Sequence, residues 1–537
     1  MRKAGIVVAC ALVLAMLATT GAQARRVVTI RGGGWGHGIG MSQYGAYGQA
    51  LNGRSAKRIL EKYYTDAHVA TKEMPAKVRV GLMQTRTSIA FRSLARVNGG
   101  GEIAVKVEGA SGFLARGGTN TQWRIERSPT GGLRLYKNGN RVVRNGRSVF
   151  GSTQRPLLVM FERYKSLADV EGKSYNYAYG RLSFGTYNSS SCGSDYCLRL
   201  VLSLPMQKYI YGLGEVPASW PGAVLKAQAN AGRTYVYSKI VRLGQHLFPC
   251  DCAVVDTPAD QAYIGDAKRT GSGPYWDEWK GAVDATRGKV VVYKGAPIQA
   301  LYSSSSGGHT EHNENVWGGT PIPYLRGVPD PADDVPANPN HTWTLKMAWS
   351  AFSDKLNAAF GTGKLERFRV VAPRGVSGRV TVVKSVDRGG VRIVGSRKTA
   401  RADGWDIRSA VGLKDTLFWI TVKQVASPAF APLHESLGGA GGPLGQPTGG
   451  GVHSRGLPDS GRMQHFAGGT IYLNPHSDTA HALWGPIDDR YHDMGTATSA
   501  CGYPLSNTKQ VGSEVRARFE HGVMTYSAED GVAVDCA

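Results

Sequence analysis

The sequence predicts an α+β protein that is predominantly β: a mixed, strand-rich domain contains one key alanine-rich helix and is followed by a small β-rich repeat module. Three observations support this. The 537 residues include 71 glycines and only 19% charged residues, which is typical of many turns between short strands. Apolar stretches alternate with turns over residues 78–204, whereas residues 219–240 are rich in alanine. Residues 433–537 contain an internal repeat.

The first residues predict export. Arg2 and Lys3 precede an apolar run, and the small-x-small pattern of residues 22–24 follows it. The run is shorter than the about 20 residues that a membrane-spanning helix needs. We therefore expect residues 1–24 to be a signal peptide, with an uncleaved membrane anchor as the alternative, and no transmembrane segment in the mature chain.

The net charge indicates an anionic partner. The whole chain carries a formal charge of +24, and removing residues 1–24 takes away two cations and no acid, which leaves +22. Such a charge favours anionic cell-wall polymers or anionic lipid surfaces. The basic residues are scattered and are not interleaved with aromatic residues in a binding module, so we do not expect nucleic acid as a partner.

An even number of cysteines in an exported chain predicts disulfides. Those that follow residue 24 are Cys192, Cys197, Cys250, Cys252, Cys501 and Cys536. The simplest pairs are Cys192–Cys197 and Cys501–Cys536, in which case Cys250 and Cys252 pair with each other or stay reduced. Zinc held by His246, Cys250 and Cys252 is an alternative. We expect no other cofactor.

The N-terminal half combines short strands with one early helix. A strand is predicted at residues 27–30, before a glycine-rich segment at 31–46 that lets the backbone come close to another group. Apolar residues spaced for one helix face follow between residues 56 and 63. Residues 78–204 have the pattern of a β meander.

The alanine-rich segment predicts a helix that begins at residues 219–221 and continues to about residue 240, with Pro221 in its first turn. Its polar residues fall at spacings of four, three and four and so share one face; they are Lys226, Asn230, Arg233 and Tyr237. Glu215 precedes this helix. The helix N-terminus favours an ionised Glu215, whereas the apolar neighbours at 216, 217 and 220 raise its pKa.

The C-terminal half resumes with strands at residues 288–293 and 298–302, which lead into a serine-glycine loop at 303–310. A proline-rich passage and further strands to about residue 422 follow, and we expect a linker at 426–435. Within residues 436–537, the sequence LGQP at 444–447 recurs as CGYP at 501–504. Such repeat modules more often bind than catalyse.

Three separated motifs carry a family resemblance. They are GWGHGIGMSQYGA at 34–46, EVPASWP at 215–221 and SSSGGHT at 304–310. Together they resemble the stage II sporulation protein D and amidase-enhancer family over about residues 25–425. Members usually carry the His-Gly segment at the end of the domain, after a stretch like residues 413–418. Here it lies at the start, which looks like a circular permutation and predicts that strand 27–30 docks beside the strands before residue 422.

The C-terminal module, residues 436–537, is similar to LGFP repeats, a wall-associated module of some Gram-positive bacteria. This similarity implies a secreted, cell-wall-associated protein in a Gram-positive-type envelope. The implied role of the module is to hold the protein near the wall polymer.

The resemblance to the sporulation protein D family implies lytic transglycosylation of peptidoglycan, with glycan strands free of stem peptides as the first substrate to try. In this reaction the 6-hydroxyl of N-acetylmuramic acid displaces N-acetylglucosamine and closes a 1,6-anhydro ring. The nucleophile belongs to the substrate, so one carboxyl group can serve as acid and base. The resemblance implies Glu215 in this role; Glu314 is an alternative second carboxylate, and helix capping is the structural alternative for Glu215.

Ten further residues, in the motifs or in the segments that follow them, are candidates for substrate binding: His37, Ser42, Gln43, Lys226, Gln228, Arg233, Tyr235, Ser305, Gly307 and Trp317. Gln228 and Tyr235 could equally brace the helix, and His37 could be satisfied by backbone groups. Ser305 lacks the nucleophile-elbow pattern of a serine hydrolase. The competing function is a non-catalytic wall protein that binds the wall or activates a peptidoglycan amidase.

Overall fold

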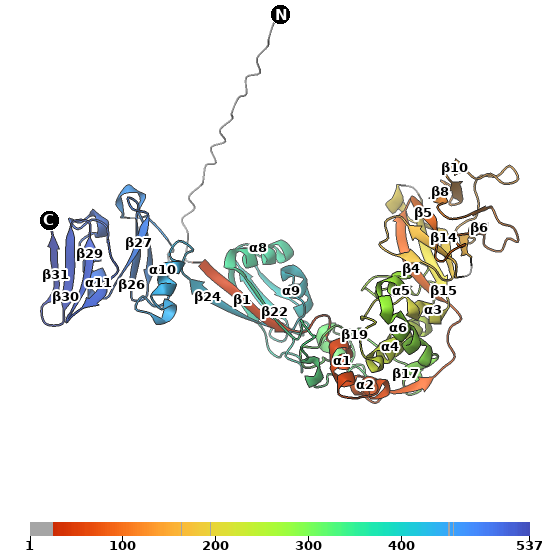
Figure 1. Ribbon diagram of the computed structural model, residues 1–537, viewed down its shortest axis with the longest axis horizontal. Helices are drawn as coiled ribbons and strands as arrows, with labels where there is room; N and C mark the ends of the chain where they lie inside the picture. Colours follow the sequence, from red (N-terminus) through yellow and green to blue (C-terminus); the bar gives the residue numbers. More distant parts are fainter. Residues whose placement is uncertain (1–24, 163, 194, 449–451, 455) are drawn as a thin grey trace, which may run out of the picture. The chain divides into compact units, whose positions relative to one another are not determined.

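The computed structural model describes residues 25–162, 164–193, 195–448, 452–454 and 456–537 (Figure 1). The predicted signal peptide, residues 1–24, lies outside the described residues. The chain forms two compact units. One comprises residues 32–343 and 365–418, and the described part of the other comprises residues 25–31, 344–364 and 419–537. Numerous small sheets and fewer helices confirm the predicted class, α+β and predominantly β.

The larger unit contains a β sandwich, which confirms the β structure predicted for residues 78–204, but its topology is not a meander because the chain passes repeatedly between the two sheets. Its seven-stranded sheet has the order β16 (Val254–Val255), β4 (Val78–Arg86), β15 (Tyr196–Leu204), β14 (Arg181–Asn188), β11 (Leu157–Phe161), β6 (Ile103–Val107) and β7 (Ala115–Gly117). The six-stranded sheet has the order β10 (Asn140–Arg141), β9 (Leu133–Lys137), β8 (Gln122–Arg127), β5 (Ser88–Ala95), β12 (Ser166–Val170) and β13 (Asn176–Tyr177). Both sheets contribute to one core, where Phe91 stacks on Phe184 at 5.4 Å.

The predicted alanine-rich helix is α4 (Gly222–Leu243), which begins after Pro221 and ends at Gly244. It is buried on two sides. Leu225 and Ala229 pack into the sandwich core, whereas Ala227 and Ala231 pack into a second core with α1 (Gln43–Leu51) and α2 (Ala56–Tyr63). Small alanine side chains allow this close approach on both sides, because protein interiors are densely packed.

The glycine-rich N-terminal segment ends in a helix that its sequence did not predict. The hydroxyl of Ser42 accepts the backbone N–H of Gly45 and so caps the start of α1. Just before it, β2 (Met41–Ser42) pairs in parallel with β19 (Tyr302–Ser303). This pairing brings the first motif beside the serine-glycine loop.

The strand predicted at residues 288–293 is β17 (Lys289–Tyr293), which pairs with β3 (His68–Thr71) and β18 (Ala296–Pro297). The prediction of one strand at 298–302 is wrong. Two short strands, β18 and β19, flank an irregular stretch there, because residues 298–301 turn towards the buried helices and leave the sheet.

Several short elements complete the larger unit. They are α3 (Met206–Tyr211), α5 (Ala267–Gly271), α6 (Trp276–Ala285), α7 (Asn313–Val316), β21 (Leu365–Val370), β22 (Val391–Gly395), β23 (Thr399–Ala402) and α9 (Gly404–Val411). The helices α3 and α6 pack beside α4, as Figure 1 shows. Among the described residues, no helix combines the length and apolar character that spanning a membrane requires.

The first strand, β1 (Arg25–Gly33), lies between β20 (Thr342–Ala348) and β24 (Phe418–Val425) in a three-stranded sheet. Helix α8 (Trp349–Phe360) follows β20. The N-terminal strand therefore docks beside the strand that ends the family-like region. This arrangement confirms the docking predicted from the permuted order of the motifs.

The internal repeat is visible in the C-terminal sheets. Pro447 bridges Phe466 and, in the second copy, Pro504 bridges Phe519. The elements are α10 (Ala431–Ser436), β25 (Arg462–Phe466), β26 (Gly469–Asn474), β27 (Thr479–Trp484) and α11 (Pro486–Asp493), then β28 (Lys509–Val511), β29 (Glu514–Phe519), β30 (Gly522–Ser527) and β31 (Gly531–Cys536). Phe430, within the linker predicted at 426–435, is buried in the same core as Leu444 of the first repeat.

The structure contains three disulfides, Cys192–Cys197, Cys250–Cys252 and Cys501–Cys536. The last one joins the start of the second repeat to its final strand. On the chain-entropy model a loop of this length stabilises the fold by about 4 kcal/mol.

Candidate active site

Glu215 lies on the loop between α3 and α4, half-buried among polar groups. Its carboxylate accepts the backbone N–H of Ala262 at 2.7 Å and a hydrogen bond from the Tyr302 hydroxyl. Burial raises the pKa of Glu215 above the usual glutamate value, although these two donors and the Lys268 cation oppose the shift. The carboxyl group is thus biased towards its neutral form and surrounded by groups that stabilise its ionised form.

Lys268 is the cation whose charge lowers the pKa of Glu215. Only 5% of the residue is exposed, and its ammonium donates to the backbone oxygen of Val216 at 2.5 Å. Burial lowers the pKa of Lys268 to about 8, while the charge of Glu215 acts in the opposite direction. At pH 7 the side chain is still mainly protonated. Sequence reasoning missed Lys268, because it lies in a short helix without a motif.

A chain of hydrogen bonds orients the Tyr302 hydroxyl towards Glu215. Tyr209 donates to the amide oxygen of Gln261 at 2.8 Å, and the amide nitrogen of Gln261 donates to the Tyr302 oxygen at 2.8 Å. Because Tyr302 accepts from Gln261, its own hydrogen is free to point at the Glu215 carboxylate. These three side chains escaped the sequence analysis, since their order in the chain gives no local pattern.

His37 lies on the other side of Tyr302. Its Nδ1 accepts the backbone N–H of Ile39 at 3.0 Å, and the backbone of Tyr302 is a hydrogen-bond partner of the ring. Burial, with the charge of Arg379, lowers the pKa of His37 to about 4. The imidazole is therefore neutral at pH 7, with its proton on Nε2 because Nδ1 is an acceptor. Tyr302 therefore contacts both residues: its backbone bonds to the His37 ring, and its hydroxyl bonds to the Glu215 carboxylate.

Gln43 brings the N-terminal segment to the same carboxylate loop. Its side-chain nitrogen donates to the backbone oxygen of Glu215 at 3.3 Å and to the amide oxygen of Gln228 at 3.2 Å. The first motif and helix α4 therefore meet at Glu215, as their similarity to one family predicted. Gln228 is fully buried, and its amide nitrogen has no hydrogen-bond partner among the described residues.

The segment that holds Glu215 is similar to a known family. The family model described as "Stage II sporulation protein" matches residues 195–293, the segment that holds Glu215, Ala262 and Lys268, and the model described as "LGFP repeat" matches residues 444–499. Residues 195–293 are therefore similar to the stage II sporulation protein family, and residues 444–499 to the LGFP repeat. The resemblance read from the motifs is therefore confirmed, together with that of the C-terminal repeat.

Similarity to individual proteins covers only parts of each chain. Stage II sporulation protein D of Bacillus subtilis is 33% identical over 163 residues, which span 29% of this chain and 47% of that protein. The Amidase enhancer of Bacillus subtilis is 37% identical over 134 residues, 25% of this chain and 16% of that protein. An uncharacterized protein of Brachyspira hyodysenteriae is 32% identical over 209 residues, 38% of this chain and 51% of that protein. The chain thus spans about half of the length of the Brachyspira hyodysenteriae protein and of stage II sporulation protein D, and less than a fifth of the Amidase enhancer.

The two faces of α4 have different partners. Tyr235 donates to Asp260 at 2.7 Å, on the segment that also carries Ala262, and Gln228 accepts from Gln43 at 3.2 Å. The Arg233 guanidinium instead donates to the backbone oxygens of Lys289 at 3.1 Å and Val283 at 3.3 Å.

Lys226 is exposed and lines a cavity of about 330 Å³ with Lys289 and Thr286, on the same side of the helix as Arg233. Among the described residues, neither Lys226 nor Arg233 makes a hydrogen bond or ion pair with Glu215. The polar face predicted for α4 exists, but its partners are on α6 and β17.

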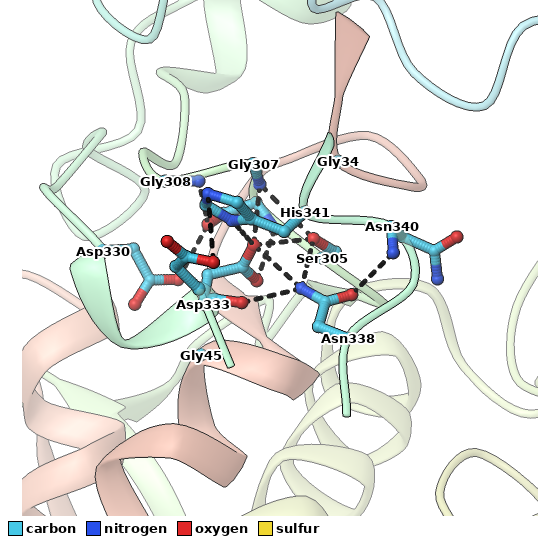
Figure 2. Close-up of polar contacts among 12 residues, drawn as sticks. Gly34, Gly45, Ser305, Gly307, Gly308, Asp330, Asp333, Asn338, Asn340 and His341 are labelled. Atoms are coloured by element: carbon cyan, nitrogen blue, oxygen red, sulfur yellow. Dashed lines mark hydrogen bonds and ion pairs between the residues drawn. The ribbon is translucent and has the colours of Figure 1, made fainter. Parts of the chain in front are cut away.

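The serine-glycine loop of residues 303–310 surrounds a buried carboxylate (Figure 2). The hydroxyls of Ser42 and Ser305 each donate to Asp333 at 2.7 Å, and the Gly307 N–H donates to it at 3.0 Å. Asn338 donates to the same carboxylate at 3.1 Å. Ser42 and Ser305 are at most 1% exposed, so their hydroxyls hold the loop in place and do not face solvent. The sequence analysis missed Asp333, which lies in the proline-rich passage.

Two tryptophans are exposed near His37. Trp317 packs edge-on against the His37 ring at 5.1 Å between ring centres, and 49% of its surface remains exposed. Trp35 is also 49% exposed and bridges Ser305 through its backbone. Large exposed aromatic side chains beside a polar site supply apolar faces for a ligand.

The other candidate carboxylates of the larger unit are either ion-paired or fully buried. Two guanidinium nitrogens of Arg326 bind Glu314 at 2.8 and 2.6 Å, and these bonds lower its pKa. Burial raises the pKa values of Asp330 and Asp415, but both residues are 0% exposed. In the described residues of this unit, Glu215 is the carboxyl that combines a raised pKa with partial exposure.

The residues considered for zinc do not fit a zinc ion. Cys250 and Cys252 are bonded to each other, so neither offers a thiolate. Nδ1 of His246 lies 2.5 Å from the carboxylate of Asp251.

Proposed function

We propose that this protein is a secreted peptidoglycan lytic transglycosylase that cleaves the bond between N-acetylmuramic acid and N-acetylglucosamine, in strands freed of stem peptides. The observation that carries the proposal is the setting of Glu215. Its raised pKa suits a proton donor, and its three partners suit a carboxylate formed during the reaction. The match to the stage II sporulation protein model over this segment supports the same reaction.

In the proposed reaction, neutral Glu215 gives its proton to the glycosidic oxygen while the bond from that oxygen to C1 of the muramic sugar breaks. The resulting carboxylate takes the proton of the C6 hydroxyl, whose oxygen bonds to C1. The products are a free 4-hydroxyl on N-acetylglucosamine and a 1,6-anhydro end, and Glu215 is again protonated. No water is consumed, so one carboxyl group suffices.

The surrounding residues stabilise the charged intermediate state. Between the two proton transfers, the ionised Glu215 receives hydrogen bonds from Ala262 and Tyr302 and the field of Lys268. His37 and Gln43 fix the positions of Tyr302 and of the Glu215 backbone. In this proposal the exposed rings of Trp35 and Trp317 contact the sugars.

The rest of the chain suits a location in the wall. The LGFP repeat and the formal charge of +22 after residue 24 support retention on anionic polymers of a Gram-positive-type envelope. We include this retention in the proposal.

The test is mass spectrometry of glycan strands incubated with purified protein. We expect wild-type protein to produce 1,6-anhydro ends and Glu215→Gln to lower the rate by about 10²–10⁴-fold, since the amide keeps the shape but carries no acidic proton. Glu314→Gln is the matched control and keeps the rate. Strands left intact by wild-type protein, with and without stem peptides, would falsify the proposal.

A second candidate is the non-catalytic activation of a peptidoglycan amidase. The name Amidase enhancer, carried by a relative 37% identical over 134 residues, favours it. In that case wild-type protein and Glu215→Gln raise the rate of a purified amidase equally, and neither forms anhydro ends.

A further inference from the structure

A cavity of about 490 Å³ opens on the β sandwich between β4, β14, β15 and the loop of residues 245–251. None of the residues proposed for catalysis or glycan binding lines it. Its charged lining consists of Lys77, Arg79, Arg181, Arg199, Glu108 and Asp251.

These side chains leave an excess of positive charge. Arg79 and Arg199 pair with Asp251 at 2.5 and 3.4 Å, and Arg181 pairs with Glu108 at 3.2 Å. Lys77 has no ion pair among the described residues. Four cations against two carboxylates give two uncompensated positive charges, before any protonation of His246, which also lines the cavity.

The arginines are held in place before any ligand arrives. The Cys250–Cys252 disulfide encloses Asp251, whose backbone adopts a left-handed conformation with φ of 54°. Arg79 donates to the backbone oxygen of Asp251 at 2.8 Å as well as to its carboxylate. The disulfide packs closely against Gly81, since a Cβ atom at that position would lie 2.7 Å from the Cys252 sulfur.

Arg199 is fixed from a second side, because it donates to the backbone oxygen of Pro249 at 3.1 Å. Only 14% of its side chain is exposed, and burial lowers its pKa. The Nε atoms of Arg199 and Arg181 are buried without hydrogen-bond partners among the described residues. Burying a guanidinium group with unbonded nitrogen atoms costs free energy unless an anion offsets the charge.

We propose that this cavity binds a phosphate group carried by a phosphorylated glycan. A phosphate monoester carries about −1.5 to −2 charges at pH 7, which matches the excess of two, whereas one carboxylate would offset half of it. Guanidinium groups bind phosphate through paired N–H donors. The volume falls within the range of small-ligand sites, about 300–1,000 Å³, so a sugar fits beside the phosphate. The site is a second contact with an anionic polymer, separate from Glu215.

The test is isothermal titration calorimetry of the purified protein with inorganic phosphate at pH 7.5 and constant low ionic strength. We expect binding in the millimolar range, and at least tenfold weaker binding by Lys77→Glu, because this change removes the whole excess charge. Arg181→Gln, which removes one charge, weakens binding severalfold. Thermal unfolding followed by circular dichroism establishes that each variant is folded.

The matched control is Lys72→Glu, an equal charge change at an exposed lysine of the same segment that does not line the cavity. It is expected to keep the affinity within twofold. Glucosamine 6-phosphate against glucosamine distinguishes a sugar-borne phosphate from the bare ion, and we expect the former to bind at least as tightly as phosphate.

Three results overturn the proposal: no binding of phosphate by wild-type protein, acetate binding as tightly as phosphate, or equal weakening by Lys72→Glu and Lys77→Glu. The last would mean that only the overall charge attracts the ion. Because the experiment measures binding and no glycan cleavage, its failure is independent of any failure at Glu215.

Discussion

Two carboxylates of the same domain, Glu215 and Asp333, show how hydrogen bonding separates a reactive acid from a structural one. Glu215 receives one backbone and one hydroxyl hydrogen bond and stays half-buried. Asp333 is 0% exposed and receives two hydroxyl, two backbone and one amide hydrogen bond, with His341 in contact as well. Five donors hold the buried Asp333 carboxylate in one position, whereas Glu215 has only two donors and remains partly exposed, as a group that exchanges a proton with a substrate must be.

The largest expected effect is the loss of stability on changing the structural carboxylate, Asp333. Asp333→Asn removes the charge that five donors share and leaves several of them buried and poorly paired. We expect a loss of about 3–5 kcal/mol in the free energy of unfolding, measured by chemical denaturation. The neighbouring Asp334→Asn is the control, since its side chain is 73% exposed, and it should change stability by less than about 0.5 kcal/mol. A small effect of Asp333→Asn would contradict the role assigned to this cluster.

Tyr302→Phe tests the hydrogen bond to the reactive carboxyl, Glu215. It removes the hydroxyl that donates to Glu215 and that accepts from Gln261. We expect a fall in kcat of about 10–100-fold, or about 1.4–2.7 kcal/mol of transition-state stabilisation. The pH above which activity falls moves upwards, because the lost donor had lowered the pKa of Glu215.

Tyr235→Phe is the matched control for this experiment. Its hydroxyl donates to Asp260, which also binds Lys239 at 2.5 Å. We expect stability to decrease by about 1 kcal/mol while kcat is kept. An equal loss of kcat in both variants would assign Tyr235 a direct role in catalysis and remove the special position of Tyr302.

Lys268→Met tests the cation beside Glu215 with a smaller expected effect. Without the charge, ionised Glu215 is less stable and its pKa rises further. The pH profile of kcat/KM should therefore keep its acidic side and extend to higher pH, with kcat about tenfold lower. In wild-type protein the cation itself is lost as pH rises past about 8, the pKa of Lys268. An unchanged profile would show that Lys268 acts only through its bond to Val216.

Local pattern predicted a good part of this molecule. Strand periodicity predicted the β structure of residues 78–204, though not its division into two sheets, and alanine content with Pro221 predicted α4. The motifs placed Gln43 at Glu215, which the structure shows. Local pattern could not predict which face of α4 meets the site, because α4 is buried on both sides and its burial has no single stripe. Nor could it find Tyr302, Gln261 and Lys268, whose contacts depend on how distant segments pack.

The same comparison predicts opposite stability effects for the two acid-to-amide changes. Because burial raises the folded-state pKa of Glu215 above its unfolded value, ionisation favours the unfolded chain, and stability is lost as pH rises through the folded pKa. Glu215→Gln removes this ionisation. It should therefore be more stable than wild type at pH 8, and the difference should shrink as pH falls below the usual glutamate range, where both side chains are neutral. Denaturation of the two proteins at pH 4 and pH 8 measures this. A variant less stable than wild type at pH 8 would mean that the ionised carboxylate is held by its partners as firmly as Asp333 is, and Glu215 would then be unsuited to release and recover a proton.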